Sequence, residues 1–287
     1  MCFLFENSEN SENSDKTKVL RRTKGIMKKK LIVCILVLSL AMALSACGGG
    51  GSASAIKSVD DLDGKRIGVQ LGTTGDIYAE DIEGAQIEQF KTGAEAVLAL
   101  KQGKIDAVII DDQPARVYAS LNNDITVLDE PFTEEEYAIC ISKEKSDLRD
   151  KMNGAIAELK ADGTLQGILD HYIGQVEGAE AYKTPPGTAY PNGQLVMATN
   201  AEFPPYEYFE DGDTIAGVDP DFARAICDRL GYELRIDHMD FDAIIVAVQS
   251  GKADFGAAGM TVTEERLTNI DFTDSYCMAS QVVIIKK

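Results

Sequence analysis

The feature that most constrains the fold is a pattern that occurs twice. The segments "ALKQGKIDAVII" (99–110) and "AVQSGKADFGAA" (247–258) each combine a helix end, a Gly-Lys turn and an Asp that leads into an apolar strand. A strand and a loop precede each one, "GKRIGVQLGTTGD" (64–76) and "GQLVMATNAEF" (193–203). Repeated strand–loop–helix units with short apolar strands are typical of α/β sheets with parallel strands. The sequence therefore predicts two α/β lobes.

Helix signals support this organisation. In "VDPDFARAICDRLGY" we expect Asp219 to be the N-cap, Pro220 to follow it and Gly231 to end the helix. Residues 146–163 show a similar helical pattern, in which we expect Ser146 to be the cap and Gly163 to follow the helix end. Residues 175–193 are rich in Pro and Gly and lack periodicity, so they predict a linker.

The N-terminal region predicts export. "MKKK" (27–30) precedes an apolar run at 31–44 that is short for a membrane span, as in a signal peptide. The following "LSAC" resembles a bacterial lipobox, in which Cys47 is lipidated; a plain secretion signal with an incidental Cys47 is the alternative. We expect residues 1–26 to be a non-native or over-extended N-terminus. A lipoprotein signal peptide follows at 27–46, then the lipidated Cys and a flexible tether at 47–55.

Charge and residue spacing exclude several classes of function. A formal net charge of −19 argues against nucleic acid as a partner, because phosphate binding needs clustered Lys and Arg. The cysteines beyond the leader, Cys140, Cys227 and Cys277, have no metal-ligand spacing and lie in apolar runs, as buried free thiols do. Only two histidines are present. We therefore expect no metal site, no cofactor and no His-based catalytic triad.

Three loops carry the chemistry. "GMTVTEER" (259–266) opens a helix that Thr263 caps, and Arg266 offers a bidentate partner for a carboxylate. "QLGTTGD" (70–76) offers hydroxyl donors and glycines that permit close approach. "IIDDQPA" (109–115) places Asp111 and Asp112 at the carboxyl end of a strand, the edge where ligands bind in open α/β sheets. Donors for a carboxylate together with an acid for an ammonium group predict an α-amino acid ligand.

These motifs resemble a known family. The stretch from "VMATNAEFPPYEY" to "GMTVTEERLTNIDFTDSY" resembles the first lobe of bacterial extracellular solute-binding proteins of family 3, the polar amino-acid receptors of ABC importers. "IKSVDDLDGKRIGVQLGTTGD", "GKIDAVIIDDQPA" and "EEYAICISKE" resemble the second lobe, and "ELKADGTLQGILDHYIG" the closing helices. The resemblance covers nearly all of residues 56–287. It implies an α/β, two-lobe periplasmic-binding-protein type II fold.

The order of the lobes is reversed relative to the family, which implies a circularly permuted chain; a chimeric or wrongly assembled gene is the alternative. We expect lobe 2 at 56–138, a hinge strand and closing helices at 139–174, the linker at 175–193, and lobe 1 with a second hinge strand at 194–287. We expect the permutation to cut one of two inter-lobe crossings. Residues 135–142 then remain as the only covalent bridge near the hinge, and "QVVIIKK" (281–287) docks by hydrogen bonds alone.

The resemblance also implies a binding site. Arg266 would clamp the ligand carboxylate with backbone N–H groups of Thr261 and Thr74, and Asp111 would pair with the ammonium group. Asp112 could compete with Asp111, whereas Glu202 and Glu207 are expected to be solvated, although one of them could select a cationic side chain. Purely structural roles, as turn formers, core aromatics or a surface arginine, are the alternatives. The expected ligand-binding residues are Arg266, Asp111, Thr261, Gly259, Thr73, Thr74, Phe203, Phe241, Asn200 and Gln70.

By this resemblance the protein is a monomeric, extracytoplasmic lipoprotein, anchored through Cys47 on the outer face of a Gram-positive cell. It would close two lobes over a polar L-amino acid and pass it to an ABC transporter permease, without acting as an enzyme. Two alternatives use the same scaffold. One is a dehydratase acting on a cyclohexadiene carboxylate, and the other is a ligand-sensing receptor domain.

Overall fold

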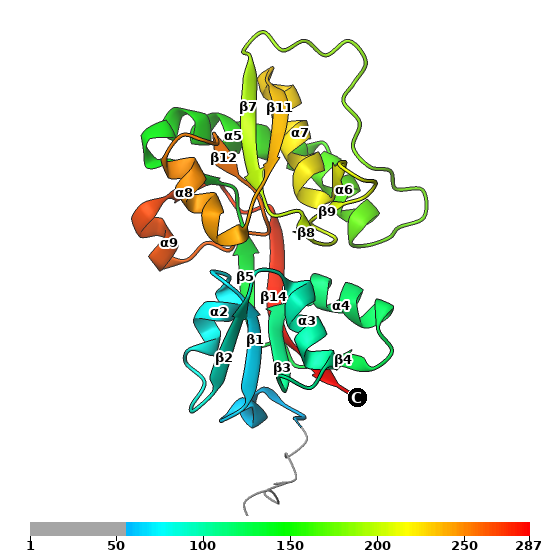
Figure 1. Cartoon of the computed structure of the whole chain (residues 1–287). Coiled ribbons are helices and arrows are strands. Elements are labelled where there is room, and N and C mark those ends of the chain that lie inside the picture. Colours follow the sequence, from blue (N-terminus) through cyan, green and yellow to red (C-terminus); the bar gives the residue numbers. More distant parts are fainter. Residues whose placement is uncertain (1–55) are drawn as a thin grey trace, which may run out of the picture. The chain divides into compact units, whose positions relative to one another are not determined.

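Two sheets with matching strand order organise residues 56–287, the part of the chain that the computed structural model describes (Figure 1). The expected N-terminal extension, signal peptide, Cys47 and tether lie outside the described residues. Within residues 56–287, every helix is too short or too polar to cross a bilayer.

The first sheet forms lobe 2 and has the strand order β2-β1-β3-β14-β4, with β5 paired to β14. Strands β2, β1 and β3 are parallel, whereas β14 is antiparallel to β3. Helices α2, α3 and α4 pack on this sheet (Figure 1). The elements of lobe 2 are η1 (Val59–Leu62), β1 (Arg66–Gln70), α2 (Thr74–Ala79), β2 (Gln86–Phe90), α3 (Gly93–Lys101), β3 (Ala107–Asp111), α4 (Asp112–Leu121), β4 (Ile125–Val127), β5 (Thr133–Tyr137) and β14 (Cys277–Lys286).

The second sheet forms lobe 1, with the order β11-β7-β12-β6-β13. Strands β11, β7 and β12 are parallel, and β6 is antiparallel to β12. A small antiparallel sheet, β10-β9-β8, lies beside it. The elements of lobe 1 are β6 (Cys140–Ile141), η2 (Lys143–Lys145), α5 (Ser146–Ala161), α6 (Thr164–Tyr172), β7 (Gln194–Thr199), β8 (Glu202–Phe203), β9 (Glu207–Phe209), β10 (Ile215–Ala216), α7 (Val218–Leu230), β11 (Glu233–His238), η3 (Phe241–Ala243), α8 (Ile244–Gln249), β12 (Phe255–Gly256), α9 (Glu264–Asn269) and β13 (Asp271–Phe272).

The internal repeat predicted from the sequence is confirmed. The two matched segments become the end of α3 with β3 and the end of α8 with β12. Each of these strands lies between the first strand of its unit and an antiparallel strand from elsewhere in the chain. The mixed α/β architecture with parallel strands follows from this arrangement.

Two strands carry the chain between the lobes, which contradicts the expected loss of one crossing. The chain leaves lobe 2 through β5 and enters lobe 1 at β6. It returns through β14, which pairs with β5 at its start and with β3 and β4 further along. The segment "QVVIIKK" is therefore covalently continuous with lobe 1 and central in the sheet of lobe 2. Any permutation has left both crossings intact.

The helix that begins at Val218 starts differently from the sequence prediction. Its N-cap is Gly217, whose φ of 129° suits glycine, and the expected cap residue Asp219 lies buried inside the first turn. Gly231 ends the helix in the left-handed conformation, as expected. The predicted linker contains no helix or strand between Tyr172 and Gln194, and Tyr182 anchors it to α7 by hydrogen bonding to Asp228.

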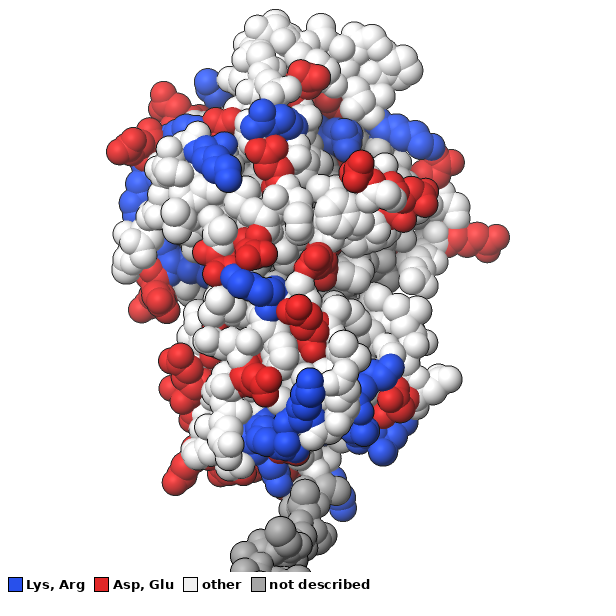
Figure 2. All heavy atoms as spheres, viewed as in Figure 1, with Lys and Arg blue, Asp and Glu red and all other residues white. Residues whose placement is uncertain are grey.

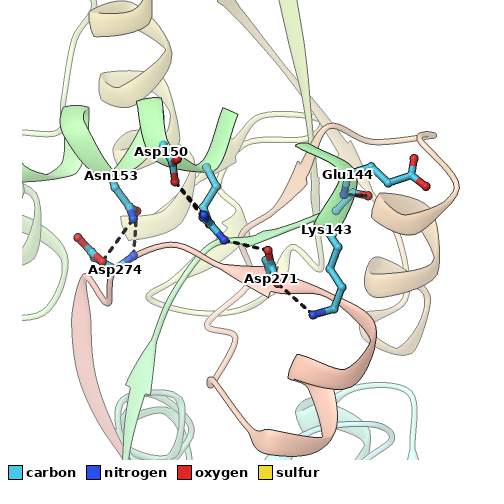
Figure 3. A network of polar contacts seen from close by, with 8 residues as sticks. Lys143, Glu144, Asp150, Asn153, Asp271 and Asp274 are labelled. Atoms are coloured by element: carbon cyan, nitrogen blue, oxygen red, sulfur yellow. Dashed lines mark hydrogen bonds and ion pairs between the residues drawn. The ribbon is translucent and has the colours of Figure 1, made fainter. Parts of the chain in front are cut away.

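A polar network fastens together the lobe 1 ends of the two crossings (Figure 3). Lys143, just after β6, and Arg149 of α5 both contact the carboxylate of Asp271 in β13 at 3.1 and 2.9 Å. Asn153, one turn further along α5, exchanges hydrogen bonds with Asp274. The segment that leads into β14 is thereby held against the helix that follows β6.

Candidate functional site

A narrow cavity of about 10 Å³ lies where the two lobes face each other. The carboxyl ends of β1 and β3 approach it from lobe 2, and the loops after β7 and β12 approach it from lobe 1. This is the edge of an open α/β sheet at which ligands bind. All ten residues expected from the sequence line the cavity, together with Ala258: Gln70, Thr73, Thr74, Asp111, Asn200, Phe203, Phe241, Gly259, Thr261 and Arg266.

Arg266 supplies a buried positive charge. Its residue is 6% exposed, and its guanidinium donates to the carbonyl oxygens of Thr261 at 2.7 Å and Gly72 at 2.9 Å. The guanidinium carbon lies 5.6 Å from the ring centre of Phe241. Within residues 56–287 it makes no ion pair, and burial lowers its pKa from the ordinary value for arginine. The predicted helix cap, Thr263, accepts the N–H of Arg266 and so places the residue at the start of α9.

Asp111 supplies a buried negative charge at the end of β3. It is 5% exposed and accepts a hydrogen bond from the hydroxyl of Tyr137. Burial raises its pKa to about 7, and the nearby charge of Glu135 acts in the same direction. Asp112 contacts Gln113 and Arg116 instead and does not line the cavity, so it does not compete with Asp111 there.

Gly259 lies in the left-handed region, with φ of 52°, beside the ring of Phe203. Its N–H donates to Asp219 at 2.7 Å. Both carboxyl oxygens of Glu207 are buried without a hydrogen-bond partner among the described residues, and burial together with the charge of Asp219 raises the pKa of Glu207 well above the ordinary value. Glu207 is fully buried, which contradicts the expectation that it is solvated, whereas Glu202 is exposed as expected. Asp219 accepts a second hydrogen bond from the hydroxyl of Tyr276 at 2.7 Å and so holds the loop that carries Gly259.

The three threonines have different partners. Thr73 caps α2, accepts the N–H of Asp76 and donates to the carbonyl of Gln70, so its hydroxyl is committed to the loop itself. The hydroxyl of Thr74 instead accepts a hydrogen bond from Gln281 on the crossing strand β14, and the hydroxyl of Thr261 donates one to Glu135 on the crossing strand β5. Thr73 therefore also has the turn-forming role that the sequence left open.

Two further pairs complete the walls. Gln70 of lobe 2 donates to Asn200 of lobe 1 at 2.9 Å, which closes one side of the cavity. Phe203 stacks on Tyr206 with ring centres 5.9 Å apart, and Phe241 lies under Arg266. The aromatic residues thus serve the core and the cavity together.

Sequence reasoning missed three residues behind these walls. Tyr137 lies in the expected hinge segment 135–142, and its hydroxyl donates a hydrogen bond directly to Asp111. Glu135 and Gln281 are also buried and bind the cavity threonines. A signal existed for Glu135, because the in-out alternation of β5 puts it on the same face as Tyr137.

A lysine bridges the two lobes by contacting two aspartates. Lys91 of lobe 2 contacts Asp240 and Asp242 of lobe 1, each at 3.1 Å. On the face that Figure 2 shows, acidic and basic side chains are interspersed over both lobes. Among residues 56–287 no group of three or more His, Cys, Asp or Glu is arranged to hold a metal ion. Cys140 and Cys227 are buried free thiols, as expected, while Cys277 is partly exposed.

Part of the chain is similar in sequence to known amino-acid-binding proteins. Residues 195–287 match the family described as bacterial extracellular solute-binding proteins, family 3. The arginine-binding extracellular protein ArtP of Bacillus subtilis is 39% identical over 94 residues, which are 33% of this chain and 36% of ArtP. The L-cystine-binding protein TcyJ of Escherichia coli is 33% identical over 121 residues, 42% of this chain and 46% of TcyJ. The chain thus spans less than half the length of these curated relatives.

Solved structures with local similarity include single domains. The arginine-bound form of domain 1 from TmArgBP is 34% identical, with 33% of this chain and 81% of that one covered and a TM-score of 0.29. Domain 2 from TmArgBP is 38% identical, with 26% and 80% covered and a TM-score of 0.24.

Proposed function

We propose, from the match of residues 195–287 to the bacterial extracellular solute-binding proteins of family 3, that the chain captures a polar L-amino acid between its lobes and delivers it to an ABC transporter permease. Relatives named for binding arginine, cystine, histidine and glutamine support an amino acid as the ligand. They make these four the first candidates to test.

The observation that carries the proposal is a pair of opposite buried charges without ionic partners. Arg266 and Asp111 line one cavity, and within residues 56–287 neither forms an ion pair. An uncompensated buried charge is costly, and a bound counter-charge removes much of that cost. The α-carboxylate and α-ammonium of one amino acid provide both counter-charges at once. A plain carboxylic acid or an amine would provide only one.

The remaining cavity residues take supporting roles in this proposal. Backbone N–H groups of Thr74 and Thr261 assist Arg266 at the carboxylate, and the carbonyl of Gly259 assists Asp111 at the ammonium group. Phe203 and Phe241 flank the ligand side chain, Asn200 and Gln70 influence which side chain is accepted, and Thr73 forms the turn that presents Thr74. The cavity is narrow, so the lobes part to admit the ligand and close over it.

We also propose how the protein is presented. The leader and Cys47 anchor it to the outer face of the cell membrane as a monomeric lipoprotein that acts without a cofactor or metal. The lobe order is a circular permutation of the family order, joined through residues 175–193. Consistent with that joint, residues 175–193 contain no helix or strand and run over α7 through Tyr182.

A thermal-shift panel of the twenty amino acids on residues 48–287 tests the function. A ligand at 100 times its dissociation constant stabilises the folded state by roughly 2.7 kcal/mol. We expect Arg266→Ala to abolish the shift, because the carboxylate loses its bidentate partner. The matched control is Arg235→Ala, which removes an exposed arginine from lobe 1 and should leave the shift intact. Absence of a shift with every amino acid would refute the proposal.

A further inference from the structure

A chain of buried polar side chains joins the two walls of the cavity through the crossing strands. Gln281 on β14 donates from its Nε2 to Thr74 Oγ1 and to Glu135 Oε2, both at 3.1 Å. Thr261 donates from its Oγ1 to the same oxygen of Glu135, on β5, at 2.8 Å. Each of these four residues is at most 5% exposed. The chain therefore runs from a threonine of lobe 2, through both crossings, to a threonine of lobe 1.

The direction of every hydrogen bond in this chain follows from the carboxylate. An ionised carboxylate only accepts, so Gln281 must turn its NH₂ group toward Glu135, and Thr261 must use its single hydroxyl hydrogen there. The oxygen of Thr261 then has only acceptor capacity left for the cavity. Thr74 receives a hydrogen from Gln281, so its own hydroxyl hydrogen remains available as a donor. The two threonine hydroxyls thus offer opposite hydrogen-bonding roles to the cavity, because Thr74 can donate and Thr261 can only accept.

We propose that Glu135 and Gln281 are positioning residues that fix the orientation of the bound amino acid. By making Thr74 a donor and Thr261 an acceptor, they direct the ligand carboxylate toward the first and the ligand ammonium group toward the second. This inference rests on the proposed amino-acid function and identifies residues that support the site without lining the cavity.

The position of Asp111 agrees with this orientation. Asp111, the partner proposed for the ammonium group, is bonded to Tyr137, and Tyr137 forms a β-bridge with Thr261. The ammonium end therefore has an acceptor hydroxyl and a carboxylate on the same side. The guanidinium of Arg266 donates to the carbonyl oxygens of both Gly72 at 2.9 Å and Thr261 at 2.7 Å, so it contacts both loops. The two threonine hydroxyls, and not Arg266, therefore distinguish the two ends of the ligand.

Glu135 keeps this arrangement at a cost in stability. Its Oε1 and the Oε1 of Gln281 are buried without a hydrogen-bond partner among the described residues. An unsatisfied buried acceptor destabilises the folded state. A residue retained despite such a cost is typical of functional sites, where stability and activity trade against each other. Loss of Glu135 should therefore reduce binding without reducing the melting temperature.

The test is Glu135→Gln, with Glu136→Gln as the matched control at an exposed position of the same strand. The amino acid with the largest thermal shift is titrated by calorimetry, along with its decarboxylated amine and its carboxylic acid without the amino group. We expect Glu135→Gln to weaken binding of the amino acid and of the amine by about ten-fold or more, since charge-assisted hydrogen bonds are involved. Binding of the carboxylic acid should change less than about two-fold, and the control should match wild type throughout.

A double-mutant cycle that combines Glu135→Gln with Thr261→Val separates an effect on the orientation of the Thr261 hydroxyl from an effect of the Glu135 charge alone. If Glu135 acts by orienting the hydroxyl of Thr261, its substitution has little further effect once that hydroxyl is gone. An equal loss in both backgrounds would overturn the inference, because it would indicate a charge effect alone. Equal weakening of the amino acid and the carboxylic acid, or no weakening, would also overturn it while leaving the proposed function intact. Failure of wild type to bind any amino acid would refute both.

Discussion

The buried carboxyl of Asp111 makes ligand binding dependent on pH. Its pKa is raised to about 7, first by burial and then by the charge of Glu135. Near pH 7 about half of the ligand-free molecules therefore carry a proton on this group. An α-ammonium group needs the ionised carboxylate, so binding must displace the proton. Affinity should rise with pH through this range and reach a plateau above it.

The magnitude follows from the titration. The apparent affinity is reduced by a factor of 1 plus the ratio of protonated to ionised Asp111, which is about 11 at pH 6 and about 1.1 at pH 8. We therefore expect affinity to differ about ten-fold between these pH values, equivalent to about 1.4 kcal/mol. Titration calorimetry at pH 7 in two buffers of different ionisation heat should show release of about half a proton per ligand.

A matched ligand provides the control. The carboxylic acid that lacks the amino group does not need ionised Asp111, so its binding should not release this proton. Affinity for the amino acid that stays constant within about two-fold from pH 6 to pH 8, or uptake of a proton on binding, would show that Asp111 does not meet the ammonium group.

Two further substitutions test the loop after β12 and its support. Gly259→Ala places a Cβ 3.0 Å from the ring of Phe203 at a left-handed φ, so we expect calorimetry to show weaker ligand binding. Gly251→Ala, also at positive φ but with open space around it, is the control, and equal affinities in the two variants would contradict this account. Folding raises the pKa of Glu207, so the folded state retains its proton and stability falls as pH rises above the pKa of the unfolded carboxyl, about 4.3. In urea titrations Glu207→Gln should lose less unfolding free energy than wild type between about pH 5 and pH 9; an equal loss would place the proton elsewhere.

The periodic parts of the fold were predictable from the sequence. The two matched segments predicted β3 and β12 and, with the strands before them, two equivalent α/β units. The loops after these strands predicted the residues that line the cavity, because ligand sites in open sheets form at the carboxyl ends of strands. Their ligand roles remain predictions that the titrations above address.

Other features depend on tertiary context. Strand β9 is only three residues long, too short for alternation to show that Glu207 faces inward. Asp219 has the sequence signature of a helix cap, but Gly217 takes that position and leaves the carboxylate to the buried loop. Gln281 lies beside an apolar run without a periodic signal, and only the pairing of β14 reveals its partners. The resemblance predicted that the order of the lobes is reversed, but it did not show at which strand the permuted chain begins and ends. The sequence therefore did not predict that both crossings between the lobes are intact.

The two crossings also govern the order in which the protein can fold. Lobe 2 is built mostly from residues before the linker, yet its sheet needs β14, which is translated after every other described element. Lobe 1 in turn includes β6 from the earlier half. Each half of the chain therefore donates a strand to the other, and the sheet of lobe 2 stays incomplete until the ribosome has added residues 277–286, whereas all five strands of the lobe 1 sheet precede them. A nascent chain stalled before that point would expose the edges of β3 and β4, which makes it a substrate for chaperones rather than a folded domain.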